Sequence, residues 1–285
     1  MSEKTEISWT DATWPVVAGC TKVSPGCTHC WAIRDSWRLS HNPNPKVAEV
    51  YAGTVLKNSA GELNWTGVVR LQPQRLDWPL RWKDPRRIFV CSQADLFHEA
   101  VPDWYVDHVW ATMLLAPRHT FQVLTKRPER MLAYLTAPAL YERVLRQADV
   151  RRVSRSGLSM IGVSNPTTHP AKWIWLGVTA EDQAAADERI PLLLQTPAAV
   201  RFVSCEPLLG PVSICAVPDS SLDWVIVGGE SGPRARAMNI QWARSVKDQC
   251  VSAGVPFFFK QAKVDGKLAK MPQLDGRTWN EMPEV

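Results

Sequence analysis

The chain has 285 residues, of which 45% are hydrophobic and 21% charged, and its net charge is +5. This composition fits a folded globular protein with a substantial core, and the mild positive charge is compatible with a polyanionic partner. No apolar run approaches the roughly 18 residues that a membrane-spanning helix requires. The polar start MSEKTEISWTD is unlike a signal peptide, so we predict a cytoplasmic protein without membrane contact.

Short apolar, β-branched runs recur along the chain, with polar or helical stretches between them. In chain order, the predicted strands are TWPVVAGC (13–20), RIFVCS (87–92), TFQVLTK (120–126), WIWLGVT (173–179), VRFVSCE (200–206), DWVIVGGE (223–230) and VPFFFKQ (255–261). Runs this continuous are typical of strands that are buried on both faces, as in parallel sheets.

Helical patterns alternate with these strands. They cover residues 103–116, 180–196 and 239–254, and the last begins at a capping Asn239 and ends at Gly254. The alternation predicts a single α/β domain over residues 1–285, built as a full or partial (β/α) TIM-like barrel of about six to seven parallel strands. A doubly wound sheet stays open as an alternative, although no G-x-G-x-x-G follows the first strand.

Two stretches interrupt this rhythm. Residues 41–68 are rich in Pro, Asn and Gly and predict an elaborated loop, and residues 137–172 form a second elaboration with an arginine-rich run. That run is either a solvated helix face or a phosphate-contacting arm. Its arginines are Arg143, Arg146, Arg151, Arg152 and Arg155, and we take the last three, with Arg127, as candidate nucleic-acid contacts. The 14 tryptophans allow two interpretations, core packing or base stacking.

Polar residues follow almost every predicted strand. In β/α barrels the chemistry lies at these carboxyl ends of the strands. The residues are Ser92, Gln93, Asp95, Thr125, Lys126, Arg127, Thr179, Glu181, Ser204, Glu206, Gly228, Gly229, Glu230, Ser231, Lys260 and Gln261. A lysine directly after a buried strand is expected to point into a pocket, and paired glycines let the backbone approach a ligand closely. The sequence therefore predicts one polar site at this end of the sheet.

Cys20, Cys27 and Cys30 form a C-x6-C-x2-C array directly after the first predicted strand. Three interpretations are open. A structural zinc site would need a fourth ligand such as His29 or His41. A redox pair of Cys27 and Cys30 would leave Cys20 without a role. A [4Fe–4S] cluster on three thiolates would keep one iron position open, as catalytic metal centres do.

Eight blocks along the chain extend this pattern. They read TEISWTDATW, GCTKVSPGCTHCWA, DLFHEAVP, FQVLTKRPERM, WLGVTAEDQAAADERIPLL, FVSCEPLLGP, WVIVGGESGPRARAM and DQCVSAGVPFFFKQ, in this order, from about residue 5 to the end. Together they resemble a phage and prophage family of three-cysteine, radical-SAM-like proteins of unassigned function, within the radical S-adenosylmethionine (SAM) superfamily. The array departs from the common C-x3-C-x2-C spacing of that superfamily, and the Gly-Gly-Glu sequence comes near the sixth strand instead of the second.

The resemblance implies that Cys20, Cys27 and Cys30 bind a [4Fe–4S] cluster, which cleaves SAM reductively and generates a 5′-deoxyadenosyl radical. Catalytic roles are expected for Lys126, Glu206, Glu230 and Lys260. Cofactor binding is expected for Trp31, Ser92, Gln93, Asp95, Thr125, Thr179, Glu181, Gly228, Gly229 and Glu230. Either Glu230 or the Ser92–Asp95 segment would hold the SAM amino group. The expected reductant is a flavodoxin or a ferredoxin.

The expected substrate is a nucleic-acid base, in phage DNA hypermodification and by a radical isomerisation of a modified base. Such a base would enter the barrel mouth after extrusion from its strand. Two alternatives are open: a radical SAM repair enzyme that acts on damaged pyrimidines, and a non-enzymatic zinc or iron–sulfur module that binds DNA.

Overall fold

The computed structural model describes residues 5–150, 170–214, 222–232 and 234–284. Its centre is an eight-stranded sheet in the order β1-β6-β7-β8-β9-β10-β11-β12. The first seven strands run parallel, and β12 is antiparallel to β11. The strands are β1 (Ala12–Trp14), β6 (Arg87–Val90), β7 (Thr120–Thr125), β8 (Ile174–Thr179), β9 (Val200–Cys205), β10 (Trp224–Gly228), β11 (Phe257–Val264) and β12 (Lys267–Lys270).

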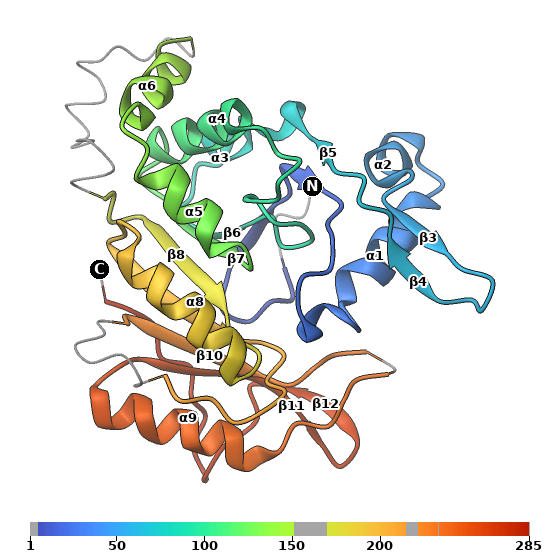
Figure 1. Cartoon of the computed structure of the whole chain (residues 1–285), viewed down its shortest axis with the longest axis vertical. Helices are drawn as coiled ribbons and strands as arrows, with labels where there is room; N and C mark the ends of the chain where they lie inside the picture. Colours follow the sequence, from blue (N-terminus) through green and yellow to red (C-terminus); the bar gives the residue numbers. More distant parts are fainter. Residues whose placement is uncertain (1–4, 151–169, 215–221, 233, 285) are drawn as a thin grey trace.

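The sheet curls into a half-barrel that stays open between β1 and β12 (Figure 1). The predicted α/β class is confirmed, and a partial barrel is compatible with this sheet, whereas the closed barrel is wrong. The predicted strand number omits β12, because its sequence KLAK is lysine-rich and contains no apolar run. The antiparallel hairpin that β12 forms with β11 also ends the β/α alternation.

Side chains alternate between the two faces of the sheet, and both faces are apolar. The outer face packs into the main core beneath the helices, through residues such as Val123, Val203 and Val227. The inner face carries a separate aromatic cluster of Trp9, Trp175, Phe202, Trp224 and Phe258. Burial on both faces is the reason that the strand sequences are continuous apolar runs. For these tryptophans, the packing interpretation is confirmed.

The helices α4, α5, α8 and α9 lie along the outer side of the half-barrel (Figure 1). The bounds are α4 (Asp103–Leu114), α5 (Pro128–Leu135), α6 (Leu140–Val150), α8 (Gln183–Gln195) and α9 (Ile240–Ala253). The predicted ends of α9 are confirmed, since the Asn239 side chain caps its first turn and Gly254 ends it with a φ of 67°. No helix in the described ranges is long and apolar enough to cross a membrane.

The single strand predicted over 13–20 is wrong, because Pro15 divides it. β1 joins the main sheet, and β2 (Val17–Ala18) pairs antiparallel with β5 (Arg70–Leu71). The loop predicted over 41–68 is a folded elaboration that contains a helix and a hairpin. With β5, the elements between β2 and β6 are η1 (Pro25–Cys27), α1 (Trp31–Ser40), α2 (Pro45–Tyr51), β3 (Val55–Lys57), β4 (Leu63–Trp65), η2 (Pro73–Arg75) and α3 (Trp78–Arg81).

The arginine-rich run begins on α6. Arg143 does not face solvent freely, because its guanidinium lies 3.1 Å from the buried Asp107 carboxylate and 5.5 Å from the centre of the Tyr134 ring. Its role is therefore to pack α6 on α4. Arg151, Arg152 and Arg155 lie outside the described residues, so their assignment as nucleic-acid contacts stays a prediction.

Candidate functional site

A cavity of about 1170 Å³ opens at the carboxyl ends of the parallel strands. All three cysteines of the array line it. Most of the predicted rim residues line it as well: Trp31, Ser92, Gln93, Asp95, Thr125, Lys126, Arg127, Thr179, Ser204, Glu206, Gly229, Glu230, Ser231, Lys260 and Gln261. Glu181 and Gly228 are not part of the lining and lie behind it. The parallel topology thus gathers one polar wall from six strand ends, as the sequence predicted.

The cysteine loop (residues 19–30) crosses one side of this cavity. Gly19 begins it with a φ of 89°, and the loop continues through the 3-10 turn Pro25–Cys27 to Cys30, the residue before α1. Burial raises the pKa of the Cys20 thiol to about 12, with a further contribution from Asp95, and burial also raises the pKa of Cys30. A metal that binds here must displace these protons, so its affinity depends on pH.

The cysteine side chains line one cavity without a prearranged ligand geometry. Among the residues that the structure describes, no three His, Cys, Asp or Glu side chains converge as a metal-binding group. Cys20 and Cys30 pack against the same small apolar cluster around Trp65. The donor set is nevertheless suited to soft metals, because three thiols face a common space.

Two other residues were candidates for a fourth ligand. The His41 ring bonds to the Trp37 carbonyl at 2.8 Å and to the Ser40 hydroxyl, and His41 is not part of the cavity lining. His29 lines the cavity close to Glu230, whose pKa its charged form would lower. Neither arrangement completes a closed four-ligand site around the three cysteines.

The first anchor of the cysteine loop is a buried network around Asp95. The Asp95 carboxylate accepts hydrogen bonds from the Thr125 hydroxyl at 2.7 Å, the Lys126 amide at 3.0 Å and the Arg127 guanidinium at 3.0 Å. The same guanidinium donates to the Thr21 hydroxyl at 2.7 Å, directly after Cys20. Arg127 is thus committed to internal contacts, which support a positioning role instead of a phosphate contact.

The second anchor is Glu181, whose side chain is fully buried. One carboxylate oxygen accepts from the Ser24 hydroxyl at 2.6 Å and contacts the Lys126 ammonium, and the other accepts from Arg189 at 2.9 Å. Gly26 packs so closely on this carboxylate that a larger residue would collide with it. Burial alone would raise the pKa of Glu181, but Lys126 and Arg189 outweigh it and hold this pKa below the ordinary 4.5.

The third anchor joins Glu230 to Arg236. The Arg236 guanidinium makes bonds of 2.6 and 3.0 Å to the two Glu230 oxygens, and it also donates to the Pro25 carbonyl at 3.0 Å. Burial opposes ionisation of Glu230, but the hydrogen bonds from Arg236 lower its pKa. The three rim acids at positions 95, 181 and 230 therefore hold the cysteine loop through basic or hydroxyl partners.

Glu206 and Lys260 form a polar pair on the inner side of the cavity. The Lys260 ammonium lies 2.8 Å from one Glu206 oxygen, which makes no well-directed hydrogen bond, so the contact is mainly electrostatic. The Ser204 hydroxyl donates to the other oxygen at 3.2 Å. Gly228 lies beneath Glu206, where a side chain would approach this carboxylate to 2.7 Å. The glycine is thus required by Glu206 and not by a ligand.

The remaining predicted residues have less specific surroundings. Gln93 donates to Asp35 and accepts from the Tyr51 hydroxyl at 2.9 Å, so its amide links the sheet to α1 and α2. The Thr179 carbonyl accepts from Arg189. Trp31 lines the mouth of the cavity and is 39% exposed.

Sequence reasoning missed Ser24, Arg189 and Arg236. Arg236 is the most accessible to a test, because Arg234 on the same segment is a matched control that pairs with the exposed Glu62. We expect Arg236→Ala to lower the free energy of unfolding by roughly 1–3 kcal/mol, since the buried Glu230 loses both guanidinium hydrogen bonds and keeps only the backbone amide of residue 236. Cys27, which is 8% exposed, should also react faster with a thiol reagent.

Thiol-labelling rates and urea unfolding of Arg236→Ala and Arg234→Ala check this expectation. Arg234→Ala should leave both measurements unchanged. Equal labelling rates in the unaltered chain, Arg236→Ala and Arg234→Ala would show that Arg236 does not hold the cysteine loop.

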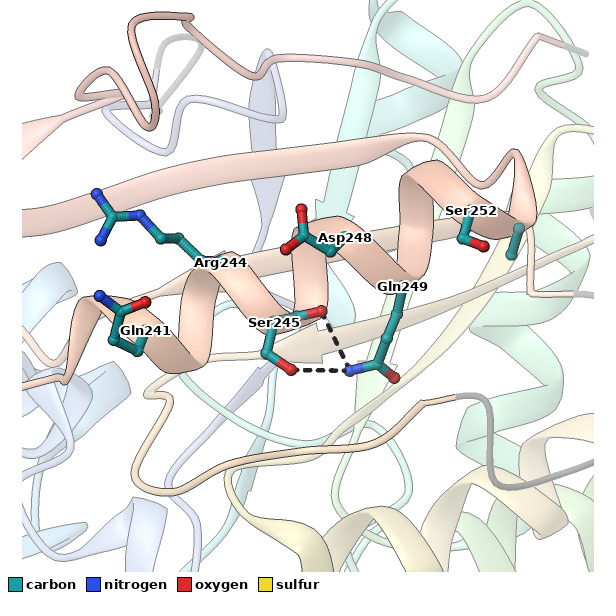
Figure 2. A pocket seen from close by; sticks show the side chains of 7 residues that line it. Gln241, Arg244, Ser245, Asp248, Gln249 and Ser252 are labelled. Atoms are coloured by element: carbon teal, nitrogen blue, oxygen red, sulfur yellow. Dashed lines mark hydrogen bonds between the residues drawn. The ribbon is translucent and has the colours of Figure 1, made fainter.

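A second hollow, of about 660 Å³, lies on α9 (Figure 2). One face of this helix supplies its lining, and the labelled Gln249 side chain turns back on Ser245. Gln249 also bonds to the Val212 carbonyl and the Ile214 amide. This hollow shares no lining residue with the cavity at the strand ends.

The family model described as "Protein of unknown function (DUF5131)" matches residues 4–283. The chain belongs to this family. No curated protein and no solved structure matches the chain significantly. Membership of the DUF5131 family therefore spans the whole half-barrel and the cysteine loop, and it assigns no reaction. The link to radical SAM proteins and to phages therefore stays a prediction.

Proposed function

We propose that this chain is a radical SAM enzyme in which Cys20, Cys27 and Cys30 hold a [4Fe–4S] cluster. The observation that carries the proposal is the common cavity that these three thiols line at the carboxyl ends of a parallel half-barrel. Three thiolates leave one position for S-adenosylmethionine, as a catalytic metal centre requires. When bound, the cluster and SAM supply reductive cleavage of a sulfonium and hydrogen abstraction from a substrate.

Cys91 also lines the cavity and is the further thiol that the proposal must exclude as a ligand. Cys91 is 2% exposed and belongs to the main hydrophobic core. Cys20 and Cys30, by contrast, are only partly buried. The surroundings of Cys91 are those of a buried structural cysteine and support a three-thiolate site.

The protein's own residues position the cysteine loop and enclose the cavity. The Asp95, Glu181 and Glu230 networks fix the cysteine loop against the strand ends. The inner aromatic cluster borders the cavity through Trp9, so an apolar surface faces the proposed reaction site and would exclude water from that side. Glu206 and Lys260 face the cavity as the groups that would bind polar substrate atoms or exchange a proton.

The proposed substrate is a nucleic-acid base, and the proposed electron donor is a flavodoxin or ferredoxin in the cytoplasm. The cavity volume of about 1170 Å³ exceeds the roughly 300–1000 Å³ that one drug-sized ligand occupies. That volume supports a second ligand beside SAM.

Anaerobic reconstitution with iron and sulfide tests the proposal. We expect a brown iron–sulfur protein that forms 5′-deoxyadenosine from SAM after reduction. Oligonucleotides with programmed base modifications and with pyrimidine dimers, supplied in parallel, separate hypermodification from lesion repair. A colourless zinc protein, or a cluster that does not respond to SAM, would support the non-enzymatic DNA-binding module and contradict the proposal.

A further inference from the structure

The hairpin of β11 and β12 presents lysines to the cavity on one face only. Lys263 pairs with Leu268, and Gln261 pairs with Lys270. Directly opposed residues of antiparallel strands share a face. Because Gln261, Leu268 and Lys270 line the cavity, Lys263 lies on the cavity face as well. Val264 and Lys267 form the next pair and therefore lie on the opposite face.

Helix α1 faces this hairpin across the cavity mouth. Trp31 and Arg34 are exposed residues of α1 that line the cavity. The Arg34 guanidinium lies 3.7 Å from the position that a side chain on Gly232 would take, and the Lys263 ammonium donates to the nearby Ala235 carbonyl at 3.2 Å. Both cations thus border the same short segment after β10, and with Lys270 they form a basic arc (Arg34, Lys263 and Lys270).

The charges of the basic arc are only weakly satisfied. Lys270 pairs with Glu6 at 2.8 Å, but the Glu6 side chain is 92% exposed. Exposed ion pairs contribute little, so a phosphate can replace this carboxylate at small cost. Among the described residues, no carboxylate lies within 4.0 Å of the Arg34 guanidinium, whereas Arg38, one turn further along α1, pairs with Asp35.

We propose that the basic arc binds single-stranded nucleic acid, with its phosphates on the arc and one base stacked on Trp31. Spaced cations beside an exposed aromatic ring are the combination that binds an unpaired strand. A paired base could not reach a recessed cavity without extrusion from its duplex. That the ligand is a nucleic acid rests on the proposed function. The basic arc and Trp31 add the surface that binds it and the inference that the bound strand is single.

Fluorescence anisotropy with the full-length chain tests this surface. The probes are labelled oligothymidylate and oligouridylate of about 12 nucleotides, within the usual site sizes, and a DNA duplex of the same length. We expect a single strand to bind about tenfold more tightly than the duplex, and the two single-stranded probes separate DNA from RNA.

Lys263→Ala with Lys270→Ala should lower the salt dependence of log Kd by about 1.4, for two lost phosphate contacts. Trp31→Ala should weaken binding by at least about fivefold and leave the salt dependence unchanged.

Two controls remove lysines outside the basic arc, and the second matches the loss of two charges. Lys267→Ala removes a lysine from the opposite face of the hairpin. Lys83→Ala with Lys172→Ala removes two exposed lysines that precede β6 and β8, at the amino ends of the strands. We expect both controls to bind like the unaltered chain.

Three results would overturn the proposal: equal losses in the control pair, duplex binding as tight as single-strand binding, or no effect of Trp31→Ala. Oligonucleotide binding requires neither the cluster nor SAM. A failure of oligonucleotide binding is therefore distinguishable from a failure of the proposed function. The proposed function is measured separately, as SAM cleavage in the absence of oligonucleotide.

Discussion

Replacing Cys20, Cys27 or Cys30 by alanine is expected to abolish cluster incorporation and SAM cleavage, whereas Cys91→Ala should retain both. Each of the three thiols is one third of the proposed protein ligand set. Even residues that only orient metal ligands affect metal affinity or activity by 10- to 100-fold, so removal of a ligand should reduce SAM cleavage by more than about 100-fold. Iron and sulfide content after anaerobic reconstitution, and 5′-deoxyadenosine formed, are the measurements.

Cys91→Ala makes this series decisive. Cys91 is buried and lines the same cavity, but it packs within the main hydrophobic core. A loss of cluster in this variant, equal to that in the other three, would indicate four thiolate ligands. Such a site would leave no position for SAM and would contradict the proposed function.

The sheet was predictable because its parallel strands are buried on both faces. β6 to β11 all coincide with apolar runs in the sequence. β12 has no such run, since it forms a lysine-rich hairpin at the edge of the sheet. Helix α1 was not predicted, because it begins directly after Cys30 without a capping side chain and without an acidic residue in its first turn, so no start signal marks it.

The location of the site was predictable from the sequence. The hydrogen-bond and ion-pair partners of its residues were not. The rule that parallel strands end at one edge places Asp95, Glu206 and Lys260 around one cavity. The pairing of Glu181 with Ser24 joins residues 157 positions apart, which no local pattern specifies. Arg189 did give a signal, because an arginine within the buried stretch of an Ala-rich helix requires a carboxylate partner.

Glu181→Ala is expected to lower the free energy of unfolding by about 3–5 kcal/mol, because it leaves Arg189 and Lys126 without their carboxylate in a buried site. Glu188→Ala is the matched control. It removes an exposed glutamate from α8, the helix that carries Arg189, so its effect should stay within about 0.5 kcal/mol. Urea unfolding of the three proteins at neutral pH measures both changes.

The contribution of Glu181 should also depend on pH. Its pKa in the folded chain lies below the ordinary 4.5, so the unfolded chain binds this proton more tightly. The stabilisation is then complete above about pH 4.5 and is lost as the pH falls through the lower folded-state pKa. We therefore expect the difference in free energy of unfolding between the unaltered chain and Glu181→Ala to be constant from neutral pH to about pH 5. Below the ordinary pKa of a glutamate, this difference should shrink.

Glu181→Gln separates stability from the positioning of the cysteine loop. The amide retains an oxygen that can accept from Ser24, but it removes the charge that faces Lys126 and Arg189. If Glu181 anchors the loop, labelling of Cys27 by a thiol reagent should be faster in Glu181→Ala than in Glu181→Gln, even though both variants lose stability. Equal labelling of the two variants would mean that the Ser24 contact does not hold the loop, and that Glu181 acts only through its buried ion pairs.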